Sequence, residues 1–187
     1  MIAGALSWPV AQPLETARLH LLALRIEDAA EAAAAFADPR LHEFTGGRPA
    51  TPAQLRVRYI AQVTGSSPDG SQGWLNWTVR DESWAVVGTV QATLQLVTGC
   101  PPRPRGDHPS LEAELAWVVA VPAQGLGYAR EAVGAVVEWL STQGVASYLA
   151  HIHPTHHASA AVAAALGLAP TDTLVDGEVE WRRRQPE

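Results

Sequence analysis

The sequence predicts a mixed α/β fold, and two observations support that prediction. Two β-rich segments, residues 75–81 and 84–97, are separated only by the short turn Glu82-Ser83, which predicts an antiparallel hairpin. From residue 111 onward, strand-like segments alternate with segments of helical periodicity. This order predicts a right-handed strand–helix–strand crossover, and therefore a parallel pair of strands. The chain should thus combine an antiparallel first half with a parallel pair in its second half.

The first half also carries the signals of an opening strand and two helices. Residues 14–25, LETARLHLLALR, end in a short apolar run and predict a strand. Acidic residues 27–28 then open an Ala-rich helix that ends near Phe36, with both charges at its positive end. Thr51 followed by Pro52 predicts the start of a second helix, because Thr caps a helix and Pro fits its first turn.

The second half begins with a flap and a strand. Residues 99–110 include four prolines, which cannot donate to a β ladder, so this segment predicts a long flap. Residues 111–121, LEAELAWVVAV, alternate at first and then become apolar, which predicts a strand whose far end lies in the middle of the sheet. The remaining predicted elements are a helix at 128–143, a strand at 147–154, a helix at 156–166 and two strands around the turn Asp176-Gly177.

Length, composition and charge limit the classes of protein. The chain has 187 residues, 47% of them hydrophobic and 17% charged, which predicts one domain over 1–187 with its core at 14–184 and an N-terminal extension at 1–13. The net charge of −6 disfavours nucleic acid and anionic membranes as partners, and the basic run at 182–184 is interpreted as a solvated tail. No segment approaches the ~20 apolar residues that span a bilayer, and no signal peptide is recognised, so we expect a cytoplasmic protein.

Two absences exclude whole types of chemistry. The chain contains no lysine, which excludes a P-loop and any Schiff-base or pyridoxal mechanism. Cys100 is the only cysteine, so the chain can form neither an internal disulfide, nor a cysteine zinc site, nor a redox pair.

The stretch VVAVPAQGLGYAREA, residues 118–132, is the candidate functional motif. Gly125-Leu126-Gly127 joins a predicted strand to a predicted helix, and such a turn alone can be no more than a tight connection. Its place at the carboxyl end of a parallel strand favours an anion site, because free amides collect at a helix start. A dinucleotide fold is excluded, because Arg130 stands at the third glycine position. The phosphates of coenzyme A remain as the candidate ligand.

Three motifs in order resemble the GCN5-related N-acetyltransferases, the GNAT superfamily. Residues 124–129, QGLGYA, fit the Gln/Arg-x-x-Gly-x-Gly/Ala signature of that family, and 130–132 continue it as the GYAxEA form of the RimJ/RimL-like branch, which acetylates ribosomal-protein N-termini. Residues 14–29 look like the opening of that branch, and 153–168, HPTHHASAAVAAALGL, look like its second motif. The resemblance covers about residues 14–181.

The resemblance implies a single-domain GNAT-like fold that binds acetyl-CoA, the acetyl donor, where two parallel strands splay apart. Backbone groups of Val119 and Val121 would bond the pantetheine arm in the manner of an added strand. An amine acceptor, a small molecule or a peptide, would approach from the side of the two N-terminal helices and the flap. The residues implied to hold the diphosphate are Gln124, Gly125, Leu126, Gly127, Tyr128 and Ala129.

Glu114 is the candidate general base for the transfer. It lies on the predicted cofactor strand, and histone-modifying members of the resembled family place a base glutamate at a similar distance before the turn. A carboxylate there could accept a proton from the amine through water if partial burial raised its pKa. The alternative is that Glu112 and Glu114, which share a face of the strand, are solvated surface charges.

The second motif departs from the family pattern. His156 stands in place of its asparagine, so it would bind the cofactor only if an imidazole can replace the amide. Many family members carry a tyrosine acid in the following helix, but no tyrosine follows Tyr148 in this chain. Ser159, which matches the serine of the motif, or a water molecule would have to act near the sulfur.

The histidines at 151, 153, 156 and 157 raise a zinc alternative. A His-x-His pair on a strand would direct both rings to one face, and imidazole is a good zinc ligand. However, no carboxylate or cysteine is close in sequence, and no His-Glu-x-x-His helix is present. We therefore expect no metal.

These observations predict an acetyl-CoA-dependent N-acetyltransferase that transfers acetyl directly to a primary amine in a ternary complex. The first alternative is a degenerate relative that binds acyl-CoA as a sensor or docking module, which the missing asparagine and tyrosine would explain. The second is a His-dependent metalloenzyme. The identity of the acceptor and the oligomeric state stay open at this point, although the acidic chain favours a cationic acceptor and dimers are common among relatives.

Overall fold

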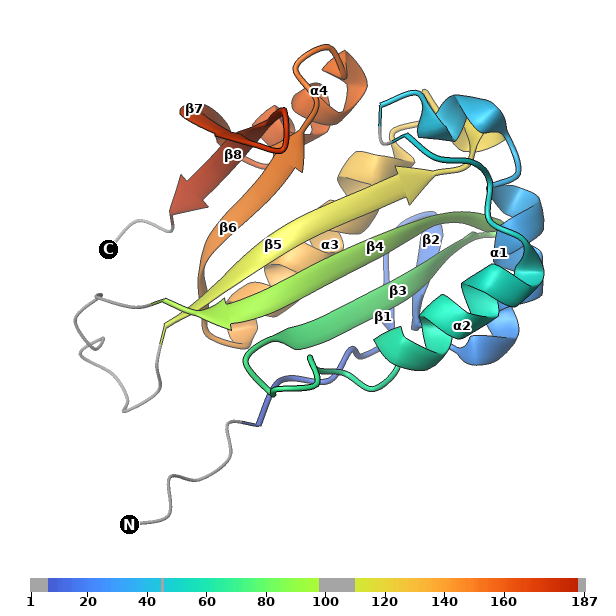
Figure 1. The fold of residues 1–187 in the computed structure, drawn as a ribbon, viewed down its shortest axis with the longest axis horizontal. Coiled ribbons are helices and arrows are strands. Elements are labelled where there is room, and N and C mark those ends of the chain that lie inside the picture. The colour runs from blue at the N-terminus through green and yellow to red at the C-terminus, as the bar shows by residue number, and fades with distance from the viewer. Residues whose placement is uncertain (1–6, 45, 98–109, 185–187) are drawn as a thin grey trace.

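The computed structural model describes residues 7–44, 46–97 and 110–184 of the chain. In that part of the chain, one sheet has the strand order β1-β2-β3-β4-β5-β6-β8-β7 (Figure 1). The strands are β1 (Leu14–Glu15), β2 (Leu19–Ala23), β3 (Gly73–Asp81), β4 (Val86–Leu96), β5 (Leu111–Val119), β6 (Val145–Ile152), β7 (Ala169–Val175) and β8 (Glu178–Arg184). The helices are α1 (Ala29–Ala35), α2 (Pro52–Gln62), α3 (Tyr128–Thr142) and α4 (His157–Ala165), with 3₁₀ turns η1 (Ile26–Asp28), η2 (Pro39–His42) and η3 (Val121–Ala123).

The topology confirms the predicted mixed α/β fold. β1 to β5 form an antiparallel meander, and β5 pairs with β6 in parallel after the crossover through α3. β8 then pairs antiparallel with both β6 and β7. The parallel pair therefore lies inside the sheet, with antiparallel strands on both sides of it. The hairpin predicted at Asp176-Gly177 joins β7 to β8, and both residues have positive φ, 50° and 86°.

Helices lie on both faces of the sheet. Figure 1 shows α3 behind β4 and β5, whereas α1 and α2 lie in front of the β2–β4 half. α3 buries one apolar side against the sheet, where Trp77 is fully buried and forms an edge contact with Trp139 at 5.7 Å between ring centroids. α1 and α2 form a smaller core of their own, in which Tyr59 and Leu55 are buried. The main core therefore fixes α3 and leaves α1 and α2 attached through fewer contacts.

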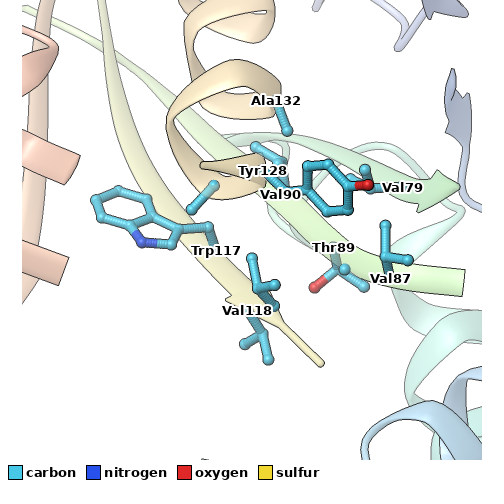
Figure 2. A pocket seen from close by; sticks show the side chains of 11 residues that line it. Val79, Val87, Thr89, Val90, Trp117, Val118, Tyr128 and Ala132 are labelled. Carbon is cyan, nitrogen blue, oxygen red and sulfur yellow. The ribbon is translucent and has the colours of Figure 1, made fainter. Parts of the chain in front are cut away.

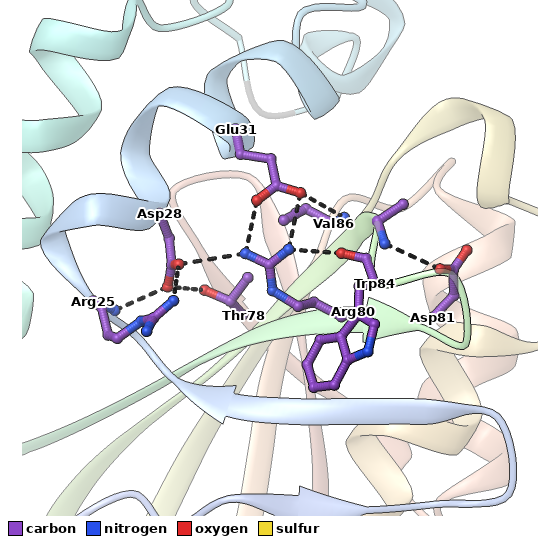
Figure 3. Close-up of polar contacts among 9 residues, drawn as sticks. Arg25, Asp28, Glu31, Thr78, Arg80, Asp81, Trp84 and Val86 are labelled. Carbon is purple, nitrogen blue, oxygen red and sulfur yellow. Dashed lines mark hydrogen bonds and ion pairs between the residues drawn. The ribbon is translucent and has the colours of Figure 1, made fainter.

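An ion network centred on the buried Arg80 and Asp28 attaches α1 to the sheet (Figure 3). Arg80 on β3 pairs with Glu31 at 2.7 Å and with the buried Asp28 at 3.4 Å. Thr78 Oγ1 also donates to Asp28 at 3.1 Å, and Arg80 Nη1 donates to the backbone oxygen of Trp84 at 2.7 Å. The hydrogen bond from Arg80 holds the pKa of Glu31 below its ordinary value, so Glu31 stays charged at neutral pH. α1 is thereby fixed over the face of the sheet on which the acceptor is expected.

Several predicted strand limits are corrected by local geometry. The strand predicted over 14–25 is two strands, β1 and β2, because the chain turns between residues 15 and 19. The strand predicted to begin at residue 84 begins at Val86, because Trp84 adopts φ 66° in the preceding turn. The strand predicted to end at residue 121 ends at Val119, where η3 begins around a proline. Each difference comes from a turn that the hydropathy pattern does not record.

The terminal segments also differ from expectation. Residues predicted as a solvated basic tail lie in β8, where Arg182 pairs with Glu180 and Glu112. Arg183 Nη1 donates to the backbone oxygen of Leu166 at 2.6 Å. In the predicted N-terminal extension, Trp8 packs against the main core. The predicted flap is outside the described residues apart from residue 110, and so is Cys100. No helix in the described ranges is long and apolar enough to cross a membrane.

Candidate active site

The parallel strands β5 and β6 separate part of the way along their length. Their register ends at the pair Glu114 and Leu149, whereas β5 continues to Val119 and β6 to Ile152. Figure 1 shows the two arrowheads diverging. Beyond the last pair, the edge of β5 that faces β6 has no ladder partner in the described part of the chain. A strand edge of this kind can bind an extended ligand through main-chain hydrogen bonds.

The predicted phosphate turn follows β5 directly and leads into α3. Gly125 and Gly127 have φ values of 77° and 82°, in the left-handed region that favours glycine. Gln124 closes the turn on the strand, because its Nε2 donates to the Val119 oxygen at 3.1 Å and its amide donates to the Val121 oxygen at 3.2 Å. Each of those carbonyls keeps a second lone pair. The sequence motif therefore forms the turn that its glycines predicted.

The first turn of α3 presents free amides beside this turn. Gly127 is the N-cap and supplies no capping side chain. In any α-helix the first amides have no partner inside the helix, and aligned peptide dipoles leave the start partly positive. The amides of Tyr128 and Ala129 are among them. An anion at this position would satisfy donors that nothing else in the helix can satisfy.

The Tyr128 side chain packs the start of α3 against the main core. Figure 2 shows its ring beside Val79 of β3 and Val90 of β4. The gap that these side chains leave is about 10 Å³, roughly the volume that a single water requires. This gap is therefore packing space and not the place of a ligand, so the cofactor would have to lie outside it, along β5 and over the turn.

Glu114 lies where β5 and β6 begin to separate. Its carboxylate is 46% exposed and lies 2.9 Å from Nδ1 of His151 on β6. In contrast, Glu112, two residues earlier on the same face, is buried and accepts from Ser147 Oγ at 2.7 Å and from Arg182. The alternative of two solvated charges is therefore wrong for Glu112. Glu114 remains accessible to water and to a ligand in the opening.

His151 is the site residue whose role the sequence did not indicate. The sequence argument considered this histidine only as a metal ligand and found no carboxylate close to it along the chain. In space Glu114 is its partner, and its other nitrogen, Nε2, is buried without a partner among the described residues. The parallel register pairs Glu114 with Leu149, so the face alternation along β6 brings residue 151 to the same side. Only the register, which the sequence does not give, reveals this contact.

His156 and Ser159 come together at the start of α4. His156 is the N-cap: its Nδ1 is 3.5 Å from the Ser159 amide, and its Nε2 is 3.2 Å from Ser159 Oγ. Phe44, from the α1–α2 connection, stacks on the imidazole with 4.1 Å between ring centroids. Burial first, and then the nearby His153, lower the pKa of His156 below 6.5, so the ring is neutral at neutral pH.

The histidines do not form a metal centre. Among the described residues, no group of three or more histidine, cysteine or acidic side chains is arranged to hold an ion. The predicted shared face of residues 151 and 153 is wrong, because β6 ends at Ile152. His153 instead lies in the following turn, with its Nδ1 3.0 Å from Thr155 Oγ1.

A groove of about 260 Å³ lies between α2 and the sheet. Thr93 on its floor is the direct cross-strand neighbour of Glu114 in the β4–β5 ladder, so the groove leads to the proposed base. Gln62 on α2 has a buried Oε1 with no partner among the described residues. The residues that line the groove are Arg58, Ala61, Gln62, Trp74, Leu75, Asn76, Gln91, Ala92 and Thr93.

Several solved structures resemble this chain in fold. The chain resembles solved structures of an acetyltransferase from Agrobacterium tumefaciens (23% identity, TM-score 0.66, covering 96% of this chain and 98% of that one) and of the ribosomal-protein-S5-alanine acetyltransferase from Vibrio fischeri (19%, 0.65, 92% and 96%). It also resembles Mycobacterium smegmatis RimJ in complex with CoA-disulfide (17%, 0.67, 92% and 86%). At these identities the likeness concerns the fold. A search of curated proteins finds no significant match.

In this chain, splayed parallel strands are followed by a glycine turn and by a helix without a capping side chain. A sequence model of the acetyltransferase (GNAT) domain matches residues 18–169, most of the chain. The chain therefore belongs to the GNAT acetyltransferase family, whose members are acetyl-CoA-dependent N-acyltransferases. The family that the three motifs resemble is confirmed.

Proposed function

We propose that this chain transfers acetyl from acetyl-CoA to the primary amine of a peptide N-terminus, directly within a ternary complex. The observation that carries the proposal is the end of the β5–β6 register at Glu114, which opens the sheet between a helix start suited to phosphate and a carboxylate suited to an amine. Acetyl-CoA would supply an activated acyl group as a thioester. The residues of the chain would bind it, orient the amine and move two protons.

The residues along β5 and the turn fit the cosubstrate. The peptide groups of Val119 and Val121 are proposed to bind the pantetheine arm, and the amides from Gly125 to Ala129 are proposed to bind the diphosphate. Because the Gly127 N-cap has no side chain, those amides are not covered. The Gln124 amide, which the prediction from sequence had included, already donates to the Val121 oxygen. A strand amide near Val119 would also donate to the thioester oxygen, which polarises the carbonyl.

Glu114 is proposed as the base that accepts the amine proton, directly or through water. Its partial exposure allows water to reach it, and His151 can hold it in position through the 2.9 Å contact. An α-amino group has an ordinary pKa of about 8, so a substantial fraction is already neutral near neutral pH. A neutral amine is a very weak acid, but its nitrogen becomes strongly acidic as the new C–N bond forms. The base therefore needs to remove the proton at that stage.

His156 and Ser159 are proposed as the route for a proton to the departing sulfur. With Nδ1 accepting from the Ser159 amide, Nε2 carries the ring proton and donates to Ser159 Oγ. The hydroxyl hydrogen of Ser159 is then free to pass to the thiolate while a water molecule returns a proton to Oγ. The Nε2 proton of His156 stays on the ring and stabilises Oγ through its hydrogen bond. The lowered pKa of His156 keeps the ring in this neutral form at physiological pH. The pair would thus replace the tyrosine acid that this chain lacks.

The groove beside α2 is proposed as the acceptor site, and its chemistry favours a peptide. Its walls carry amide and hydroxyl groups, the indole of Trp74 and the guanidinium of Arg58, but no carboxylate is among its lining residues. A polyamine or an aminoglycoside would find no counter-charge there, although the acidic net charge of the whole chain had favoured a cationic acceptor. A peptide offers both donors for Gln62 Oε1 and acceptors for Arg58. This assignment agrees with the RimJ/RimL-like character of the motifs.

Acceptor-dependent release of free CoA thiol tests the proposal. The purified chain is given acetyl-CoA and a panel that contains peptides with free N-termini, polyamines, aminoglycosides and free amino acids. We expect thiol release with peptides and little with the polycations. Release with polyamines alone would contradict the acceptor assignment.

The sensor alternative rests on the absence of the motif asparagine and of a tyrosine after Tyr148. It predicts tight CoA binding in calorimetry together with no thiol release for any amine in the panel. The same sample, measured by sedimentation, shows whether the chain forms a homodimer.

A further inference from the structure

The glycine turn before α3 is held by a residue from the opposite end of the chain. Arg18, between β1 and β2, donates from Nη1 to the backbone oxygen of Leu126 at 3.0 Å, a contact that spans 108 residues of sequence. Its Nε and Nη2 donate to Oε2 of Glu131 at 2.9 and 2.6 Å. Its guanidinium lies 4.9 Å from the centroid of the Tyr128 ring. One arginine therefore contacts both the turn and the first turn of α3.

Glu131 accepts hydrogen bonds on both of its carboxylate oxygens. Its Oε1 accepts from Thr16 Oγ1 at 2.7 Å and from the Arg18 amide at 3.0 Å, while Oε2 accepts the two guanidinium bonds. Burial alone would raise the pKa of this carboxyl, but the hydrogen bonds from Thr16 and Arg18 together lower it. The carboxylate therefore stays ionised, and its charge is matched by the guanidinium beside it.

The turn needs an external support because its own sequence makes it loose. Gly125 and Gly127 both lie in the left-handed region, and glycine has the largest conformational freedom to lose on becoming ordered. The helix start has no capping side chain to fix it. Free amides bind an anion well only if they are already aligned, since ordering them at the moment of binding costs affinity.

We propose that Arg18 and Glu131 are positioning residues that hold the amides of the turn in the geometry that binds the CoA diphosphate. This inference rests on the proposed function. Because the two charges cancel locally, Arg18 acts by fixing the turn and not by attracting phosphate. Its two bonds to Oε2 of Glu131 and its third bond to the Leu126 oxygen use the set of fixed N–H donors that only arginine provides. Arg18, which belongs to the first of the three motifs, thus supports the turn proposed to bind phosphate.

The experiment compares two ligands that differ only in the phosphate-bearing part. The full-length Arg18→Ala variant is titrated calorimetrically with CoA and with pantetheine, which has the same thiol arm but no diphosphate. We expect the Kd for CoA to rise about tenfold, as the loss of charge-assisted bonds and preorganisation implies, with the Kd for pantetheine unchanged. In turnover, KM for acetyl-CoA should rise by a similar factor while kcat stays within about twofold, because the acyl end is untouched.

Further variants separate positioning from charge and from folding. Arg18→Lys keeps the charge but loses the fixed donors, so it should lose nearly as much CoA affinity as Arg18→Ala. Arg56→Ala removes an exposed arginine on α2 and should bind CoA like the wild type. If Arg18→Ala does not fold, Glu131→Gln, which removes the charge but keeps an oxygen acceptor, should still raise the Kd for CoA and not that for pantetheine.

Three results would overturn the positioning role. These are equal losses for CoA and pantetheine, wild-type affinity in Arg18→Ala, or full affinity in Arg18→Lys. Failure of the proposed function itself has a different signature, because the wild-type chain would then neither bind CoA nor release thiol.

Discussion

The two ends of the cleft are built from different parts of the chain. At the α3 end, the groups proposed to bind the ligand are backbone amides, and they come from one continuous segment, residues 125–129. At the β6–α4 end, the groups are side chains from separate elements: Glu114 on β5, His151 on β6, and His156 with Ser159 at the start of α4. The phosphate end should therefore be sensitive to backbone geometry, and the acyl end to side-chain chemistry.

The largest effect is expected from a bulky residue in the phosphate turn. Gly127→Trp places an indole where the diphosphate would lie and strains a residue at φ 82°, so CoA binding should fall below detection in calorimetry. Gly144→Trp is the matched control, because Gly144 has a similar φ of 86° and lies beyond the other end of α3, with open space around its added Cβ. Both variants should lose similar thermal stability, but only Gly127→Trp should lose CoA. Unchanged CoA affinity in Gly127→Trp would refute the phosphate assignment.

A second large effect is expected at the acyl end. Glu114→Gln removes the base and should lower kcat about a hundredfold, within the usual range for general-base removal, with little change in CoA affinity. The rates of both proteins should rise as pH approaches the amine pKa, because more of the acceptor is then neutral, and the deficit should persist over that range because the base acts on the neutral amine as it is acylated. Stopped-time thiol assays from acidic to alkaline pH measure this. A wild-type rate at neutral pH would remove Glu114 as the base.

The neighbouring carboxylate sharpens the comparison. Glu112 shares a strand face with Glu114 but is buried against Ser147 and Arg182, so its substitution should affect folding rather than catalysis. Glu112→Gln weakens a buried charge-assisted contact and should lower the free energy of unfolding by about 1–3 kcal/mol. The kcat of the folded variant should stay near the wild-type value. A kcat loss as large as that of Glu114→Gln would mean that the two carboxylates act together.

The sequence predicts the two ends of the proposed cleft to different extents. The turn was predicted in full, because glycines at 125 and 127 and the helix after them are local signals. The contact of Glu114 with His151 could not be predicted, since it depends on the register of two strands that are joined only by a crossover. The burial of Glu112 was missed for a similar reason. Its partner Arg182 lies on β8, 70 positions later in the sequence. Local patterns gave the elements, and non-local pairing decided which polar residues meet.

The smallest effect is expected at His156, the position where the motif asparagine is missing. If the imidazole only replaces that amide, His156→Asn should bind CoA as well as the wild type and keep kcat within about fivefold, the cost of one weakened hydrogen bond. A much larger loss of kcat with CoA binding kept would show that the ring takes part in moving the proton through Ser159. Ser159→Ala in the same assay should then give a loss of the same size, because both would interrupt one route.

The pH dependence of stability separates the ring from an amide in a second way. Burial lowers the pKa of His156 in the folded chain below the 6.5 of the unfolded one, so the unfolded state takes up the proton first as pH falls. The ring therefore adds nothing to stability above about pH 6.5, and it destabilises the fold progressively from there down to its folded pKa. Thermal melts should show a shallower loss of stability on acidification in His156→Asn than in the wild type. If the melting temperatures of the two proteins fall equally as pH is lowered, His156 titrates in the folded state as it does in solvent, and Phe44 does not shield it.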